Sequence, residues 1–233
     1  MWPRPFLGGV ADVLGHRAIR RDAEGRLVAL NLDEGRLLWR SAMPLQPLLV
    51  AGELALGLAL APPRVLALSL AGAPDAPPVW TSAKLPWPDW AATTSDETGF
   101  DLELDAARIG AAVALAWQLR QRYTGGAPPG KGRARPAPVS GACAVALSDG
   151  RILPALPLPA RPADDAPAEA VDDPGVLAEQ RLGAATYRLR AVDSGGMLKT
   201  VLHALDARQG TPRWECVLDE TPRRRPMPPR PGA

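Results

Sequence analysis

The chain has 233 residues, and its 27 basic and 25 acidic side chains leave a net charge of +2. This balance argues against a surface that binds nucleic acid along the whole chain. The most apolar run, residues 45–60, is interrupted by Pro47 and Gly52 and is too short for a membrane-spanning helix. It is typical of two strands around a turn, and the 27 Pro and 22 Gly residues predict many more such short strands.

The first 17 residues lack the charged region and the apolar stretch of a secretory signal. A cytoplasmic location is therefore the default expectation, and a periplasmic location stays open. Cys143 and Cys216 permit one disulfide or none, and neither has the spacing of a zinc site. Two buried free thiols are the favoured state. The bias toward Ala, Arg, Pro and Gly is typical of a GC-rich bacterium.

Residues 27–39 predict a β-hairpin. An apolar strand that contains Ala29 leads into a turn with Asx-type residues, and a second strand ends on Trp39. Gly35 lies in the turn, where a glycine can adopt positive φ and thereby fix the register of the two strands.

Three later segments repeat this arrangement. Residues 201–214 repeat it completely, residues 65–80 have a longer turn, and residues 143–154 carry Pro154 in place of the tryptophan. A longer turn is tolerated because the entropy of loop closure grows slowly with loop length. The positions expected to be structural repeat residues are Ala29, Gly35, Trp39, Ala67, Trp80, Gly150, Ala204, Asp206, Gly210 and Trp214.

One or two further strands are predicted before the second, third and fourth copies, for example in residues 47–60 and 101–123. Two strands and one hairpin make a four-stranded sheet, which is the unit of a β-propeller blade. The chain has room for about four to six such blades.

Ala-Leu-Asn/Asp, followed by a glycine turn and a tryptophan, resembles the repeat of the pyrroloquinoline-quinone-like (quinoprotein-type) β-propellers. That group contains the quinoprotein dehydrogenases and the propeller lipoprotein of outer-membrane barrel assembly. The resemblance implies an all-β, propeller-like array of blades. The chain is short for this family, so three alternatives stay open: a compact, reduced propeller, an open arc closed by a second copy, or a shortened, degenerate member of the family. The resemblance also implies that Trp39 and Trp214 pack between neighbouring blades, and we expect the repeat to form the inner hairpin of each blade.

One propeller-like domain is predicted over residues 1–220, with a flexible Pro/Arg-rich tail over residues 221–233. Composition rich in Pro, Gly and small polar residues predicts three long loops within the domain. They are expected at about residues 84–99, 124–141 and 156–175.

Trp87 and Trp90, in the first of these loops, are the candidate partner-binding residues. Exposed aromatic side chains on a rigid scaffold commonly mark contact sites. The alternative is that this loop folds back and caps one end of the propeller.

The sequence predicts no catalytic, cofactor-binding or metal-binding residues, and no cofactor. His16 and His203 are the only histidines, and neither lies near a nucleophile motif. The acidic pairs lie in residues 156–175, which lack the rigid, desolvated setting that paired catalytic acids need. Quinoprotein enzymes hold a quinone and Ca²⁺ through acidic ligands and often a vicinal disulfide, and this chain has no adjacent cysteines.

A non-catalytic scaffold for protein–protein interaction or assembly is therefore the favoured function. A protein partner or self-association is expected, because the open-arc alternative leaves strand edges and an apolar blade face uncovered. Nucleic acid is not expected as a partner. The alternative is a quinoprotein-related enzyme or a small-ligand-binding propeller.

Overall fold

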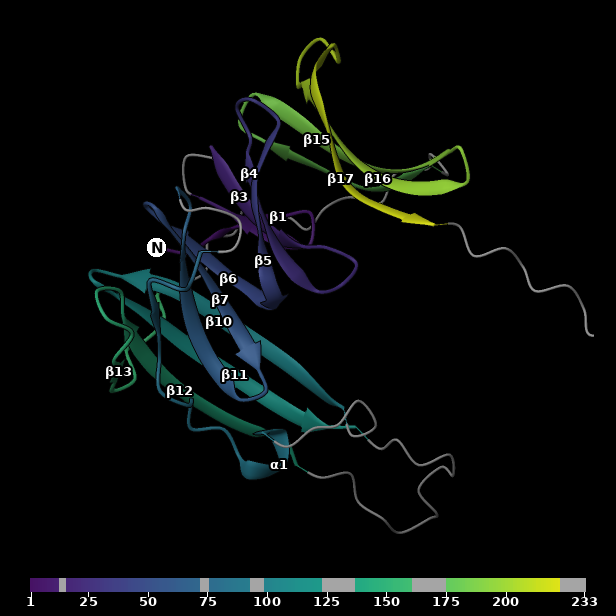
Figure 1. Ribbon diagram of the computed structural model, residues 1–233. Coiled ribbons are helices and arrows are strands. Elements are labelled where there is room, and N and C mark those ends of the chain that lie inside the picture. Colours follow the sequence, from purple (N-terminus) through teal and green to yellow (C-terminus); the bar gives the residue numbers. More distant parts are fainter. Residues whose placement is uncertain (13–15, 72–75, 93–98, 123–136, 161–174, 223–233) are drawn as a thin grey trace, which may run out of the picture. The chain divides into compact units, whose positions relative to one another are not determined.

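The computed structural model describes residues 1–12, 16–71, 76–92, 99–122, 137–160 and 175–222. Within these ranges the fold is all-β, with four antiparallel sheets and one short helix, α1 (Asp89–Ala92) (Figure 1). Three sheets have four strands and one has five. The prediction of an all-β chain built from four-stranded sheets is confirmed. None of the described helices is long and apolar enough to cross a membrane.

The sheets, named A to D in chain order, are simple meanders in which each strand pairs with the next along the chain. Sheet A contains β1 (Arg4–Phe6), β2 (Gly9–Ala11), β3 (Arg17–Arg21), β4 (Arg26–Asn31) and β5 (Arg36–Pro44). Sheet B contains β6 (Gln46–Ala51), β7 (Leu54–Leu60), β8 (Pro63–Ser69) and β9 (Trp80–Thr81). Sheet C contains β10 (Phe100–Ile109), β11 (Ala112–Gln121), β12 (Val139–Ala146) and β13 (Ile152–Leu153). Sheet D contains β14 (Val176–Leu182), β15 (Ala185–Ser194), β16 (Met197–Asp206) and β17 (Pro212–Pro222).

The chain forms two compact units. Unit 1 comprises Met1–Asp33 and Leu38–Ala166, and it contains sheets A, B and C. Unit 2 comprises Glu34–Leu37 and Pro167–Ala233, and it contains sheet D together with the turn of the β4–β5 hairpin. The prediction of one propeller-like domain over residues 1–220 stays a prediction.

Sheet B is covered on both faces, which explains why its strands are nearly continuous apolar runs. Side chains alternate between the two faces of a strand. In β7 the small residues Ala55 and Ala59 pack in a cluster with β3, β4 and β5 of sheet A. The larger Leu56 and Leu58 pack in a second cluster with sheet C. Sheet A approaches β7 so closely that a Cβ atom on Gly57 would lie 2.7 Å from Leu27 Cδ1.

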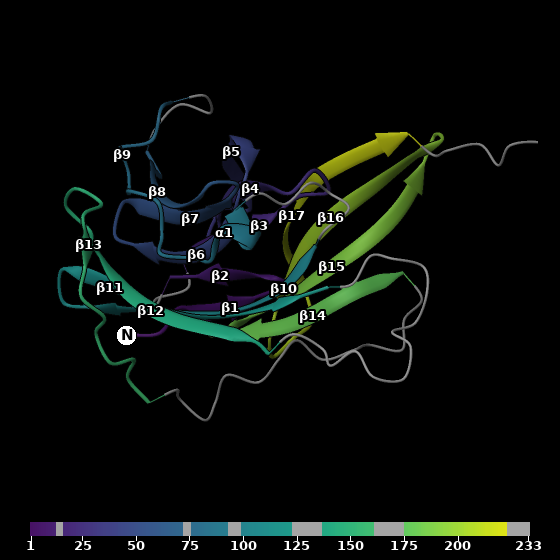
Figure 2. The same cartoon turned by 90° about the horizontal axis from the view of Figure 1, so that it is seen from below.

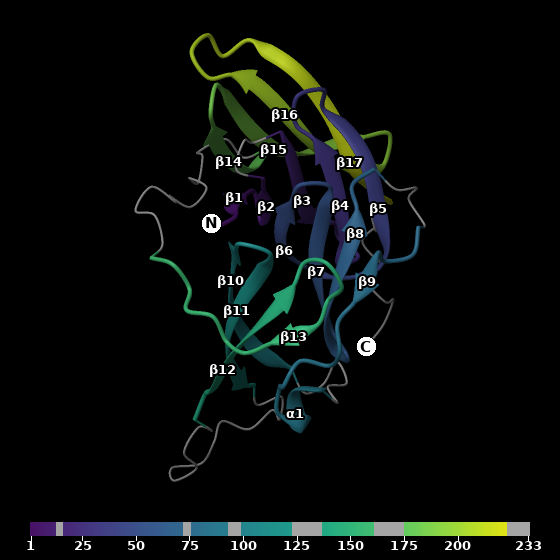
Figure 3. The same cartoon turned by 90° about the vertical axis from the view of Figure 1, so that its left-hand side faces the viewer.

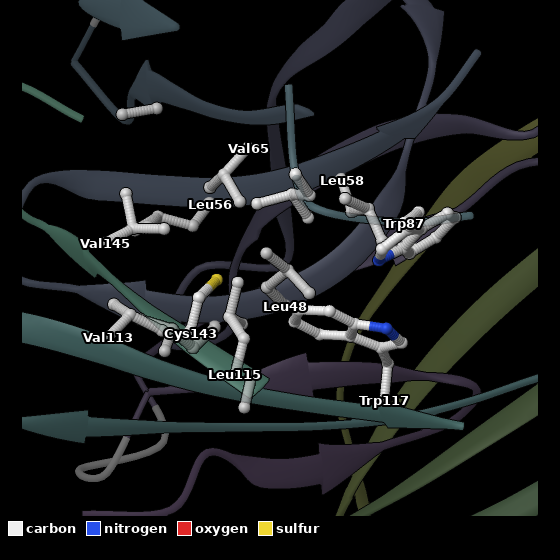
Figure 4. Packing of buried hydrophobic residues seen from close by; sticks show 14 of the residues in the cluster. Leu48, Leu56, Leu58, Val65, Trp87, Val113, Leu115, Trp117, Cys143 and Val145 are labelled. Carbon is white, nitrogen blue, oxygen red and sulfur yellow. The ribbon is translucent and has the colours of Figure 1, made fainter. Parts of the chain in front are cut away.

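The larger cluster forms the core between sheets B and C. Figure 4 shows Leu56, Leu58 and Val65 of sheet B facing Val113 and Leu115 of sheet C, among other members of the cluster. Trp87 and Trp117 lie together at one end of this layer (Figure 4), with ring centroids 6.4 Å apart. Each fully buried leucine contributes about 2 kcal/mol of hydrophobic stabilisation. The core of unit 1 therefore depends on leucine, valine and tryptophan.

The strand β6 contacts both β2 of sheet A and β10 of sheet C, and Figures 2 and 3 show these strands from two directions. β2 is preceded in its sheet by the short β1, whereas β6 and β10 are the first strands of theirs. In sheets A, B and C the repeat segments are the last two strands, whereas β2, β6 and β10 are among the first strands of their sheets. The expectation that the repeat forms the inner hairpin of a blade stays a prediction.

The predicted long loops are only partly irregular. Residues 139–141 belong to β12, where Gly141 pairs with Trp117 and a Cβ atom on this glycine would lie 2.6 Å from Trp117 Cζ2. The described part of the segment 156–175 includes Pro159, whose carbonyl oxygen accepts a hydrogen bond of 3.0 Å from Trp2 Nε1. The remaining predicted loop residues, 93–98, 124–136 and 161–174, and residues 223–233 of the predicted tail lie outside the described residues.

Trp39→Ala should lower the free energy of unfolding by about 3–5 kcal/mol, the range for truncating a buried aromatic side chain. Trp39 is 4% exposed and packs in the cluster shared by sheets A and B. Urea denaturation followed by circular dichroism measures the effect. Trp90→Ala is the control, because Trp90 is only partly buried and its loss should cost clearly less. Equal costs for the two variants would contradict this account of the core.

Candidate functional site

A tryptophan from one sheet lies on a glycine turn of the next sheet in unit 1. Trp80 of β9 packs on the β12–β13 turn, where a Cβ atom on Gly150 would lie 2.5 Å from Trp80 Cε3. The indole Nε1–H donates a hydrogen bond of 2.9 Å to the carbonyl oxygen of Leu147 in the same turn. Gly150 has φ +74°, so the turn needs glycine both for its backbone conformation and for the space that the indole fills.

The same contact recurs inside unit 2. A Cβ atom on Gly35, which has φ +66°, would lie 2.3 Å from Trp214 Cδ2. The indole of Trp214 also packs against Tyr187, with ring centroids 5.8 Å apart. Gly35 and Trp214 belong to the first and last copies of the repeat, so the structure brings together the two copies that match best.

Trp39, at the equivalent place in β5, is buried against sheet B. Its cluster includes Leu66 of β8 and Leu70, which directly follows β8. Its Nε1–H is buried and has no hydrogen-bond partner among the described residues. A cavity of about 80 Å³ lies beside it, lined mainly by apolar groups that include Leu66, Leu68 and Pro78. Trp39 thus packs between two sheets, but without the indole hydrogen bond that Trp80 makes.

The other repeat residues are buried in strands or form hydrogen bonds within turns. The methyl groups of Ala29, Ala67 and Ala204 are fully buried in β4, β8 and β16. The Asp206 carboxylate accepts backbone N–H bonds from Arg208 (2.9 Å) and Gln209 (3.0 Å), and these bonds lower the pKa of Asp206. Asn31 makes the comparable bond in the first copy, from the N–H of Asp33 (2.9 Å). These polar side chains therefore shape the turns.

Trp87 does not form an exposed platform. Its side chain is 4% exposed and belongs to the core between sheets B and C, with an edge-to-face contact to Phe100 at a centroid distance of 5.8 Å. Trp90, on α1, is partly buried and contacts the same phenyl ring at 6.2 Å. The described part of the segment 84–99 thus folds back onto the core, as the alternative interpretation of this loop expects.

A cavity of about 240 Å³ is lined by residues of β2, β6 and β10 near the point where these strands meet. Its charged lining residues are Asp12 and Arg108. Asp12 accepts the backbone N–H of His16 (2.8 Å), and Arg108 Nε–H donates to the carbonyl oxygen of Gly110 (3.2 Å). Both charged groups are therefore engaged in local turn contacts.

The described residues do not fit a Ca²⁺-quinone site. Ca²⁺ takes about six to eight oxygen ligands. The described part of the chain contains no group of three or more His, Cys, Asp or Glu side chains that could hold a metal ion. The buried carboxylate of Asp22 is instead bound by two guanidinium groups, from Arg26 at 3.0 Å and from Arg40 at 3.1 Å. This ion pair network links β4 and β5 to the β3–β4 turn.

The two histidines lie in different units. In unit 1, His16 Nδ1 lies 2.8 Å from an Asp33 carboxylate oxygen, and both side chains are exposed. In unit 2, His203 Nδ1 lies 3.8 Å from Glu215 of the neighbouring strand. Neither contact includes a serine or cysteine nucleophile.

Both cysteines are free thiols, and burial raises the pKa of each. The pKa of Cys143, in the core between sheets B and C, is raised to about 11. Because the thiolate is the reactive form, a raised pKa makes both groups poor nucleophiles at neutral pH.

No protein-family model matches the chain, and no curated protein matches it. The function is therefore inferred from the contacts and the burial of the chain's own side chains.

Sequence reasoning missed three features of these sites. Trp117 and its partner Gly141 lie on paired strands, and alternation in residues 112–119 is the signal that could have placed Trp117 in the core. The Leu147 carbonyl is a backbone acceptor, for which the side-chain sequence holds no signal. The third feature is a strip of valines on sheet D, which depends on strand register and is described below.

Gly150→Ala should lower the free energy of unfolding by about 2–4 kcal/mol, because it adds left-handed backbone strain and displaces the Trp80 indole. Gly110→Ala in the same sheet is the matched control. Gly110 has φ +57° and open space around its Cβ position, so only the strain, about 1 kcal/mol, is expected. Urea denaturation of both variants gives the difference, and equal losses would show that the indole contact adds nothing.

Cys216 should react with iodoacetamide at pH 8 about tenfold faster than Cys143 in the native protein. Cys143 is 3% exposed and its pKa of about 11 leaves little thiolate at this pH, whereas Cys216 is partly exposed. Mass spectrometry of the two labelled peptides measures the rates. In urea the two rates should converge, and native rates that are already equal would contradict the burial of Cys143.

Proposed function

We propose that the protein is a non-catalytic, β-propeller-like scaffold that binds another protein. Three features support the propeller-like interpretation. The sheets of unit 1 stack face to face, the strand β6 of sheet B contacts β2 of sheet A and β10 of sheet C, and a tryptophan of one sheet lies on a glycine turn of the next. Stacked sheets with one shared edge are the arrangement that blades adopt around a propeller axis.

The observation that carries the binding role is a strip of valines on one face of sheet D, which we call the valine strip: Val192, Val201 and Val217. Val201 pairs with Val217, and Val192 pairs with Lys199, two positions from Val201 on the same face. The three side chains therefore run diagonally over β15, β16 and β17. Val192 is 38% exposed and Val217 is 41% exposed.

Charged pairs border the valine strip on the same face. Lys199 and Glu220 form an ion pair of 2.8 Å on one side, and Arg188 and Glu179 form one of 2.6 Å on the other. Val192 and Val217 are exposed at the two ends of the strip, whereas Val201 between them is 6% exposed and pairs with Arg190. Two exposed apolar side chains bordered by charged pairs support a contact surface, because apolar contacts within a polar rim are the usual anatomy of one.

The double variant Val192→Glu/Val217→Glu tests the proposal. The tagged full chain is isolated from the cells that naturally contain it, and the proteins that remain bound are quantified by mass spectrometry. We expect the wild-type chain to retain at least one defined protein partner. The double variant should retain at least about tenfold less of it, because two carboxylates would be desolvated in the contact.

Thr81→Glu/Ala83→Glu is the control, because it adds the same charge at two exposed positions of unit 1. It should retain the partner like the wild type, and circular dichroism verifies that all three proteins are folded. The proposal fails if the wild-type chain retains no protein above the tag alone. It also fails if the valine double variant and the control retain equal amounts.

A further inference from the structure

The β16–β17 turn of sheet D, Asp206–Gly210, has the same backbone geometry as the β12–β13 turn that receives Trp80. Gly210 has φ +68° and Gly150 has φ +74°. Each glycine N–H donates to the carbonyl four residues earlier, at 2.9 Å to Asp206 and at 3.0 Å to Ala146. The two turns therefore share the backbone conformation that receives the indole at Gly150.

The hydrogen bonds around the two turns also match. The N–H of Asp206 donates to Thr211 (2.8 Å), as the N–H of Ala146 donates to Arg151 (2.9 Å). The next residue, Ala207 in one turn and Leu147 in the other, donates its N–H to the preceding hairpin loop of the same sheet, at 3.0 and 2.9 Å. The Ala207 carbonyl is thus the counterpart of the Leu147 carbonyl, which accepts the Trp80 indole N–H.

The two turns differ in what covers the glycine. Gly150 is buried under Trp80, whereas Gly210 is exposed, and a Cβ atom built on Gly210 would meet no described atom within 4 Å. Gly35 is covered by Trp214. Among these three described turns of the repeat, only the one at Gly210 lacks its tryptophan.

The chain itself has no tryptophan to fill this place. The last strands of sheets A, B and D supply Trp39, Trp80 and Trp214, and all three are packed as described above. Sheet C ends at Leu153 and continues with Pro154. The remaining four tryptophans lie at positions 2, 87, 90 and 117, and each has contacts elsewhere. The segments that the structure does not describe contain no tryptophan in their sequence.

We infer that the Asp206–Gly210 turn is a docking site for a tryptophan on an extended segment of a partner protein. This inference rests on the proposed protein-binding function and adds the place and the chemistry of a contact. The indole face lies on Gly210, and the indole N–H donates to the Ala207 carbonyl. A second copy of the chain packs its own tryptophans in the same way, so the occupant is a different protein.

The charges at the turn define the partner further. Arg208 and Arg213 are exposed beside the turn, while the Asp206 carboxylate is used by two backbone N–H groups. Guanidinium groups bind carboxylates and also stack on aromatic faces. The expected ligand is therefore a tryptophan in an extended segment with acidic neighbours.

A peptide with the sequence of residues 77–83, PPVWTSA, is the probe, because it carries the tryptophan that fills the equivalent turn. It is titrated into the ¹⁵N-labelled full chain, and amide shifts are followed by NMR. We expect saturable shifts centred on Ala207, Arg208 and Gly210, with a dissociation constant on the order of 1 mM. A peptide with alanine in place of tryptophan should cause none, and one with an N-methylated indole should bind at least about fivefold more weakly.

Gly210→Ala should abolish the shifts, because its methyl group would occupy the place of the indole. The fold should persist, since open space surrounds that Cβ position. Gly195→Ala is the matched control in the same sheet, with φ +62° and equally open space, and it should bind like the wild type. The inference is overturned if Gly210→Ala still binds the peptide, if the shifts centre elsewhere, or if the wild-type chain self-associates in a way that Gly210→Ala removes.

These outcomes are independent of the test of the proposed function. Loss of a cellular partner through the valine strip, with no binding of the peptide, would retain the scaffold role and reject the docking turn. Binding of the peptide at Gly210, without any partner that depends on the valine strip, would reject the proposed function and retain the tryptophan site.

Discussion

The contact between an indole ring and a positive-φ glycine turn is the interaction on which the arrangement of this protein depends. Gly150 and Gly35 satisfy two conditions at once, because the left-handed backbone and the missing side chain both require glycine. The turn that sets the register of a hairpin is thus also the surface that receives the tryptophan. A substitution there disturbs a strand pair and a contact distant in sequence together.

In the core of unit 1, small side chains lie on one face of a strand and large side chains lie on the other. In β7, alanines face sheet A and leucines face sheet C, so sheet B approaches one neighbour closely and packs through bulky side chains against the other. Sheet D differs from this design. Its buried residues are few, and apolar side chains such as Val217 remain on its surface. The proposed binding function is inferred from this exposed apolar surface of unit 2.

Much of the fold follows from the sequence, because alternation and turn chemistry act over short distances. The hairpin at residues 27–39, its glycine turn and the strands of residues 45–60 all form as predicted. Trp87 illustrates the limit: a segment rich in proline has the composition of a loop, yet its burial depends on Phe100 and Trp117, which belong to another sheet. The bare turn at Gly210 is equally invisible in sequence, because its glycine is identical to those that are covered.

The pairing of Gly35 with Trp214 also has a consequence for synthesis of the chain. Proteins are made from the N-terminus, and the early sheets are local meanders that can form as they emerge from the ribosome. Trp214 lies 179 residues after Gly35, so the first glycine turn stays uncovered during synthesis until sheet D has been made. A nascent chain stalled or truncated before β17 would therefore display an uncovered docking surface at residue 35, open to the tryptophans of other unfinished chains.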